Sequence, residues 1–115
     1  MPKDDDLIPE IEALPKQPWR VRILKSVEDA GSAVDEVVVS IAHNENGEVS
    51  VELQWLGRVH DGQRLATGYH RAANVPMALL EAHVFGATWG FKGVAVSIDP
   101  QVTWDPAWGE IKSSG

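Results

Sequence analysis

The chain has 115 residues, no cysteine and a formal net charge of −7 at pH 7. A chain of this length forms one domain with a single modest core. Without cysteine it can hold neither a disulfide nor a Cys-ligated zinc ion. Its excess of acid argues against direct nucleic-acid binding, which depends on Lys and Arg against phosphates. No apolar run approaches the roughly 20 residues that cross a bilayer, so we expect a cytoplasmic protein that makes no membrane contact.

An acidic segment with several prolines opens the chain. Residues 1–17 include three successive aspartates, and such a composition favours a flexible tail. Four aliphatic residues in it leave open a short motif that binds a partner: Leu7, Ile8, Ile11 and Leu14. We assign residues 18–111 to a single α+β domain and residues 112–115 to a disordered C-terminus.

Strands are predicted by alternation of apolar and polar residues. Residues 19–25 alternate and form the first predicted strand, and the pattern resumes at about residue 34. From there to residue 69 the apolar residues share odd-numbered positions: Val37, Val39, Ile41, Val49, Val51, Leu53, Trp55, Leu65 and Tyr69. A period of two over successive segments predicts an antiparallel sheet with one face buried and one face in water.

Two turns fix how these strands pair. A three-residue loop at residues 45–47 pairs Ile41 with Val51, keeps the buried face intact and leaves Gly47 in the left-handed conformation. A three-residue loop at residues 60–62 would place Trp55 opposite Thr67. By the same rule, Leu53 would face Tyr69. We therefore predict a three-stranded antiparallel meander.

One helix follows the meander. Asn74 can cap its start, Pro76 suits the first turn and Gly90 can end it. The residues between them are apolar nearly all the way round, with a narrow polar stripe at Glu81 and Thr88. Such a helix needs cover from other segments or from a second subunit, so we expect either a homodimer through the helix or tight cover by the Trp-rich tail.

A last strand and a Trp-rich tail complete the prediction. Residues 93–99 form a strand with Val94, Val96 and Ile98 on one side. Trp104 and Trp108 in the tail are expected to lie across the core, because aromatic side chains bury the most area. The predicted fold is α+β, an antiparallel β-meander of four or five strands with one main α-helix packed on its apolar face.

Part of the chain resembles a known fold. The segment Ala66-Thr67-Gly68-Tyr69, a helix opening at Asn74 and Met77, and a strand ending Ser-Ile-Asp-Pro-Gln occur in that order. Together with the order strand, strand, strand, helix, strand, these features over about residues 35–101 resemble the first half of the ribonuclease H fold. The resemblance implies a nuclease in which carboxylates hold two divalent ions such as Mg²⁺.

The acids that this resemblance requires are only partly present. Asp99 matches a family acid, but the helix acid falls at Ala78, and Glu81 lies one turn later. The central strand, residues 37–42, has no carboxylate, which leaves Asp35 or Glu36 as the third candidate. One matched acid of three argues against this activity, so no Mg²⁺ or other cofactor is expected outside the nuclease alternative.

The histidines do not predict a metal site. They are His43, His60, His70 and His83, and no two have a spacing that brings ligands onto one local face. His83, on the apolar helix, is expected to be a hydrogen-bonded interior or interface residue. The sequence also lacks a Ser-His-Asp context and a phosphate-binding glycine loop, so no catalytic residue is assigned.

The polar face of the predicted sheet is the candidate binding surface. It consists of Glu48, Glu52, Gln54, Arg64 and His70. We therefore expect a non-enzymatic acidic interaction module that binds a protein partner, as a regulator or inhibitor of another macromolecule. The alternatives are the metal-dependent ribonuclease H-like nuclease, with Asp99 and Glu81, and a small-molecule pocket between helix and sheet.

Overall fold

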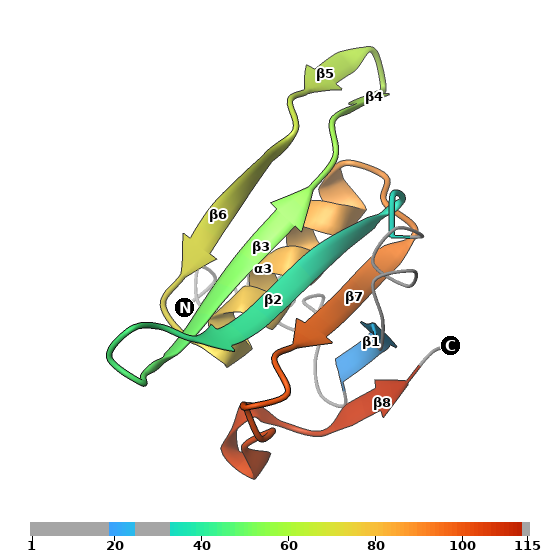
Figure 1. Cartoon of the computed structure of the whole chain (residues 1–115). Coiled ribbons are helices and arrows are strands. Elements are labelled where there is room, and N and C mark those ends of the chain that lie inside the picture. The colour runs from blue at the N-terminus through green and yellow to red at the C-terminus, as the bar shows by residue number, and fades with distance from the viewer. Residues whose placement is uncertain (1–18, 25–32, 114–115) are drawn as a thin grey trace, which may run out of the picture.

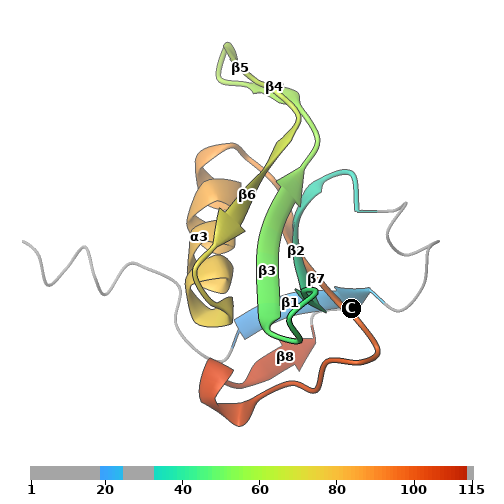
Figure 2. The same ribbon diagram turned by 60° about the vertical axis from the view of Figure 1, so that its left-hand side comes forward.

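The helix α3 (Val75–Thr88) lies on one face of a six-stranded sheet, and a two-stranded hairpin extends from one end of the molecule (Figures 1 and 2). The computed structural model describes residues 19–24 and 33–113. The strands are β1 (Trp19–Leu24), β2 (Glu36–His43), β3 (Val49–Trp55), β4 (Arg58–His60), β5 (Gln63–Leu65), β6 (Gly68–Ala72), β7 (Gly93–Ile98) and β8 (Ile111–Ser113). A short 3₁₀ helix, η1 (Pro106–Trp108), precedes β8. The predicted tail at residues 1–17 lies outside the described residues.

The sheet is mixed, with the strand order β6-β3-β2-β7-β1-β8. The α+β class is confirmed, and β2, β3 and β6 form the predicted antiparallel meander. The prediction of an entirely antiparallel sheet is wrong, because β7 runs parallel to β2, β1 parallel to β7, and β8 parallel to β1. Since α3 carries the chain from the end of β6 back to the end where β2 starts, β7 enters the sheet parallel to β2.

The first hairpin has the predicted register. Val39 lies opposite Leu53 and Ile41 opposite Val51. Gly47 is left-handed with φ +78°, and the side chain of Asn44 accepts hydrogen bonds from two backbone amides of the loop. The three-residue loop therefore keeps the apolar residues of both strands on the helix side.

The predicted register of the second hairpin is wrong by one residue. Its turn consists of Asp61 and Gly62, with φ of 52° and 77°, as a two-residue type I′ turn requires. Leu53 therefore lies opposite His70, and Gln54 opposite Tyr69. A slip of one residue exchanges the faces of a strand, so Tyr69 lies on the face away from the helix.

The core fills the space between α3 and the sheet. The side chain of Asn74 accepts a hydrogen bond from the Met77 amide, and Gly90 has φ +73°, so the predicted cap and end of the helix are confirmed. Small residues dominate the buried helix face: Ala78, Ala82 and Gly86, with Leu79 and Val75. They let the helix approach the sheet closely, and a Cβ at Gly86 would lie 3.6 Å from Val37.

Tryptophan side chains connect both ends of the described chain to the core. Trp19 donates its indole hydrogen to the Trp108 carbonyl (2.9 Å), and Trp104 donates to the Gly109 carbonyl (2.8 Å). Trp104 and Trp108 meet edge to face at 5.1 Å and pack on the core cluster, as predicted. The strand β8 extends to Ser113, beyond the predicted end of the domain at residue 111.

His83 links β1 to the helix through hydrogen-bond and ring contacts. Its Nδ1 lies 2.7 Å from the Leu79 carbonyl oxygen, and its Nε2 lies 3.3 Å from the carbonyl oxygen of Arg20. Its ring also packs against Trp19 at 5.8 Å between centroids. The expectation of a hydrogen-bonded histidine between packed elements is therefore confirmed.

Candidate functional site

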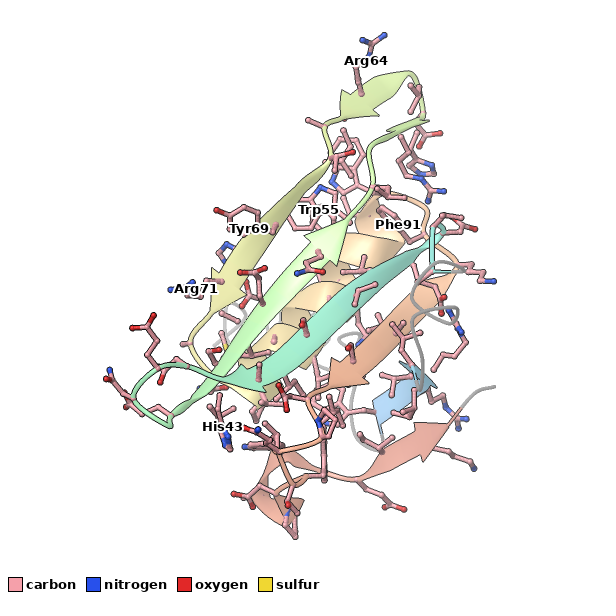
Figure 3. All side chains as sticks on the ribbon, viewed as in Figure 1. His43, Trp55, Arg64, Tyr69, Arg71 and Phe91 are labelled. Carbon is pink, nitrogen blue, oxygen red and sulfur yellow. The ribbon has the colours of Figure 1, made fainter. Side chains whose placement is uncertain are left out.

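The outer face of the sheet, opposite α3, carries a row of side chains on β3 and β6, all exposed except the half-buried Glu52. Gln54 lies opposite Tyr69, and Glu52 lies opposite Arg71. Residues directly opposite each other on antiparallel strands share a face, so all four side chains lie on this outer face. Tyr69 is 70% exposed, and both it and Arg71 project from β6 (Figure 3). We call these four residues the outer row.

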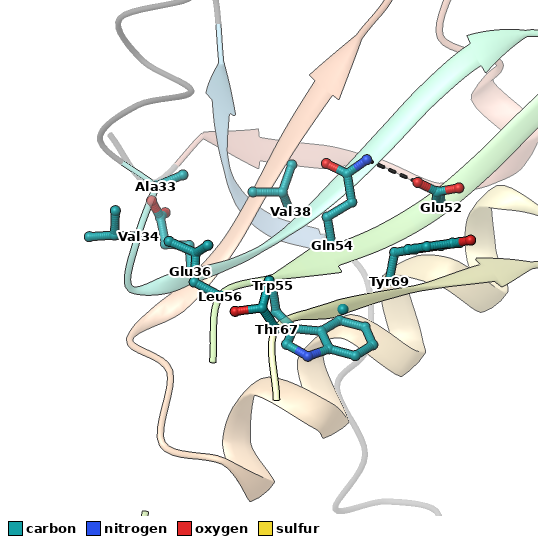
Figure 4. A pocket seen from close by; sticks show the side chains of 11 residues that line it. Ala33, Val34, Glu36, Val38, Glu52, Gln54, Trp55, Leu56, Thr67 and Tyr69 are labelled. Carbon is teal, nitrogen blue, oxygen red and sulfur yellow. Dashed lines mark hydrogen bonds between the residues drawn. The ribbon is translucent and has the colours of Figure 1, made fainter. Parts of the chain in front are cut away.

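A groove of about 660 Å³ adjoins the outer row (Figure 4). Its rim holds three exposed apolar side chains from separate segments, Val34, Leu56 and Tyr69. Gln54, which donates a hydrogen bond to Glu52 at 3.0 Å, adds a polar patch. We call this the outer groove. It combines exposed apolar area with a few polar groups, which is typical of a binding surface.

The carboxylate at the base of the outer groove is already partnered. Glu36 is 4% exposed and receives a bidentate contact from Arg22 of β1, with N–O distances of 2.6 to 3.1 Å. The strand β7 lies between β1 and β2, and its residue opposite Glu36 is Gly93. Because glycine has no side chain, nothing on β7 blocks the contact between Arg22 and Glu36. This pair therefore holds β1 and β2 together rather than presenting a free acid.

A second groove, of about 620 Å³, lies on the other side of β6, against α3. We call it the helix-side groove. Trp55 and Phe85 form its aromatic wall, with ring centroids 4.5 Å apart, and Val84 is 39% exposed beside them. His70 and Glu81 contact each other across it, with 3.2 Å between Nε2 and Oε2. This groove occupies the predicted pocket position between helix and sheet.

The strand β6 joins the two grooves. It is the first strand of the sheet order, so among the described residues only β3 pairs with it. Tyr69 and Trp55 line both grooves. We call β6 with its two grooves the β6 edge site.

The predicted binding residues do not form one surface. Glu52 and Gln54 lie in the outer groove, and Glu48 follows the exposed β2–β3 turn. Arg64 lies far from them on β5, in the small hairpin (Figure 3). His70 points to the opposite face, where it meets Glu81. The acidic character of the surface is also reduced, because Glu52 lies opposite Arg71.

Two residues of the site were missed by the sequence pattern. The alternation places Tyr69 on the buried face because of its odd number, and it gives no role to Arg71. The signal that locates both is the Asp61-Gly62 pair, because Asp-Gly is typical of two-residue type I′ turns. Taking that turn instead of a three-residue loop gives the observed register.

The candidate nuclease acids lie in separate places. Asp99 follows β7 and accepts a hydrogen bond from the Gln101 amide at 2.8 Å, while Glu81 pairs with His70. Asp35 and Glu36 lie at the start of β2, opposite the start of β7. At roughly 3.3 Å per residue, they lie about 20 Å from Asp99 along the strands. Over residues 19–24 and 33–113, no three His, Asp or Glu side chains are placed to hold a metal ion.

Arg58 positions the small hairpin against the end of the helix. Its guanidinium lies 4.2 Å from the centre of the Phe91 ring, pairs with Asp35 and donates to the Trp89 carbonyl at 3.4 Å. A cation at a helix C-terminus also interacts favourably with the helix dipole. His60 lies next to Gly90, where a Cβ would come within 2.5 Å of its ring. These contacts hold the hairpin, whose turn determines the register of β6.

Within the ranges described, no helix has the length and apolarity needed to cross a bilayer. No protein-family model, curated protein or solved structure matches this chain.

Proposed function

We propose that the protein is a non-enzymatic interaction module that binds an extended segment of a protein partner along β6. The observation that carries this proposal is a sheet-edge strand that borders an apolar groove on each face of the sheet. Capture of a segment in this way suits a regulator or inhibitor of another macromolecule.

The physics of strand addition fits this geometry. An added strand forms main-chain hydrogen bonds with the edge, and its side chains point alternately to the two faces of the sheet. One set of side chains would pack against Tyr69 at the margin of the outer groove, and the other would enter the helix-side groove beside Val84. Both positions offer apolar surface that an added strand would remove from water.

The charges of the site indicate which kind of partner segment it can bind. Near β6, Glu52 lies opposite Arg71, and the Glu81 carboxylate lies 3.2 Å from the His70 ring. The site therefore carries little net charge compared with the −7 of the chain. We propose a segment with apolar side chains at alternate positions, bound by backbone and apolar contacts rather than by a strong charge.

Selection from a displayed library of random peptides tests this proposal. We expect enriched peptides with alternating apolar residues, and slower amide hydrogen exchange in β6 when they bind, because the edge amides become hydrogen-bonded. Val84→Glu places a charge in the helix-side groove and should weaken binding by about tenfold or more. Val59→Glu is the matched control, because Val59 is 66% exposed on β4.

Two results would contradict the proposal. One is a library that yields no enriched peptide with the wild-type chain. The other is peptides that bind equally well to the Val84→Glu variant and leave exchange in β6 unchanged.

A small-molecule ligand in the helix-side groove is the second candidate. Its volume of about 620 Å³ lies within the range of roughly 300–1,000 Å³ that is usual for ligand pockets. The aromatic wall of Trp55 and Phe85 and the His70–Glu81 pair favour a flat apolar compound with one polar group. Screening of aromatic fragments by Trp fluorescence, with Val84→Glu as the blocked variant, distinguishes this candidate from peptide capture.

The ribonuclease H resemblance stays a prediction. The described elements β2, β3, β6, α3 and β7 follow one another in the order that the resemblance uses, with the small hairpin inserted before β6. The separation of Asp99 from Asp35 and Glu36 argues against the activity. Broadening of amide signals at Asp99 and Glu81 by sub-millimolar Mn²⁺, with Mg²⁺ competing, would favour the nuclease.

A further inference from the structure

We infer that the occupant of the β6 edge site is a second copy of this chain, bound by antiparallel pairing of β6 with β6 about a two-fold axis at His70. This inference rests on the proposed function, since it names the partner of the same site. It also moves the predicted homodimer from the helix to the sheet edge, where the helix contributes one side of the interface.

The sequence of β6 is complementary to itself. The strand reads Gly68-Tyr69-His70-Arg71-Ala72. Antiparallel pairing centred on His70 places Tyr69 of each copy opposite Arg71 of the other. Directly opposite side chains share a face and lie in contact, and a guanidinium over a tyrosine ring is attracted to it. The two-fold axis forms this pair twice.

The pairing also extends the outer row across the joined sheets. Within one copy, Arg71 lies opposite Glu52 and Tyr69 lies opposite Gln54. In the dimer each row therefore runs Glu52, Arg71, then Tyr69 and Gln54 of the second copy. Arg71 is placed between a carboxylate and an aromatic ring, and the 70% exposure of Tyr69 is reduced.

The helix side contributes apolar contact. A two-fold axis perpendicular to the sheet places both copies of α3 on the same face of the joined sheets. Met77, Glu81, Val84 and Thr88 follow one another at helical spacing, and all but Met77 line the helix-side groove next to β6. Met77 is 44% exposed and Val84 39% exposed in the single chain. Pairing of the β6 strands brings these apolar side chains of the two copies towards each other.

Charge favours this edge for self-association. Two chains that each carry −7 repel each other, so a contact surface of low net charge favours their association. The strand β6 contains no acidic residue, and of the nearby acids Glu52 lies opposite Arg71 and Glu81 contacts His70 within the same copy. Pairing at β6 therefore brings no unpartnered carboxylates together.

Sedimentation equilibrium of the full chain, from about 1 µM to about 1 mM, tests this inference. We expect a reversible dimer for the wild type. Tyr69→Arg places two arginines against each other at both pairs and should weaken the dimer by at least tenfold. Val59→Arg introduces the same charge at a 66% exposed position of β4 and should leave the dimer unchanged.

A mixing experiment tests the contact itself. Arg71→Glu alone removes the cation from both pairs and should also weaken the dimer. A mixture of the Tyr69→Arg and Arg71→Glu variants forms one Arg–Glu pair and one wild-type Arg–Tyr pair, so heterodimers should form more strongly than either homodimer. This gain cannot come from a folding defect in one of the variants.

The outcomes separate this inference from the proposed function. A wild-type chain that is monomeric at about 1 mM, or a dimer that Tyr69→Arg leaves intact, overturns the inference. If that monomeric chain still selects peptides that slow amide exchange in β6, the proposed function stands and its partner is another protein. If peptides also fail to bind at β6, both are wrong.

Discussion

The two hairpins that share β3 differ by one residue in their loops. The first has a three-residue loop ending in Gly47, and the second has the two-residue turn Asp61-Gly62. In the first, the alternation of the sequence matches the buried face on both strands. In the second, the alternation and the pairing disagree, and Tyr69 lies in water instead of the core.

This difference shows that loop length, not apolar character, decides which face a side chain takes. Because strand residues alternate strictly between the two faces, a single residue in a turn exchanges every side chain of the next strand. An aromatic residue that the core does not use is free to contact a partner. The second hairpin therefore places the exposed aromatic residue of the candidate site, whereas Val39, Ile41, Val51 and Leu53 of the first lie in the core.

Truncation of Leu53, which lies in both hairpins, should have the largest effect on stability. Leu53 lies opposite Val39 in one hairpin and His70 in the other, and is 2% exposed. Leu53→Ala should lower the free energy of unfolding by about 3 kcal/mol, since the removed methyl groups leave a cavity. Urea denaturation measures this change. A loss below about 1 kcal/mol would mean that the site is not packed as described.

The position of the second hairpin depends on its contact with the end of the helix. Two glycine variants measure how much this contact contributes to stability. Gly90→Ala should cost about 2 kcal/mol or more, because φ is +73° and the added Cβ meets the His60 ring at 2.5 Å. Gly47→Ala has nearly the same φ but no atom within 4 Å, so we expect about 1 kcal/mol. Thermal unfolding compares the two. Equal losses would show that His60 does not pack against Gly90.

The smallest effect is expected at the residue whose face the sequence mispredicted. Tyr69→Ala should change the free energy of unfolding of the single chain by about 0.5 kcal/mol or less, because the side chain is 70% exposed. A buried tyrosine would cost several times more. Denaturation at low micromolar concentration, where a dimer adds little, gives the value. A loss of about 3 kcal/mol would instead support the predicted register, in which Tyr69 lies opposite Leu53 and is buried.

Local signals predicted the parts of the fold that are set by neighbours in the chain. The Asn74 cap, Pro76, Gly90 and the first hairpin each depend on residues within a few positions, and the structure has them as predicted. The parallel neighbours of β7 were missed, because alternation shows that a strand exists but not its direction or partner. The Arg22–Glu36 contact and both grooves arise only when distant segments meet.

The place of β1 in the sheet has a consequence for synthesis of the chain. Its six residues, Trp19–Leu24, lie between β7 and β8, which span residues 93–98 and 111–113. The ribosome therefore releases β1 long before β7 or β8 is synthesised. Its apolar side chains cannot be buried between these strands until almost the entire chain has been made. The elements from β2 to β7 form one continuous stretch and can assemble first, since short-range contacts form fastest. The first of the described strands to be made is thus among the last to pair, and the hydrogen bond from the Trp19 indole to the Trp108 carbonyl joins it to the segment before β8.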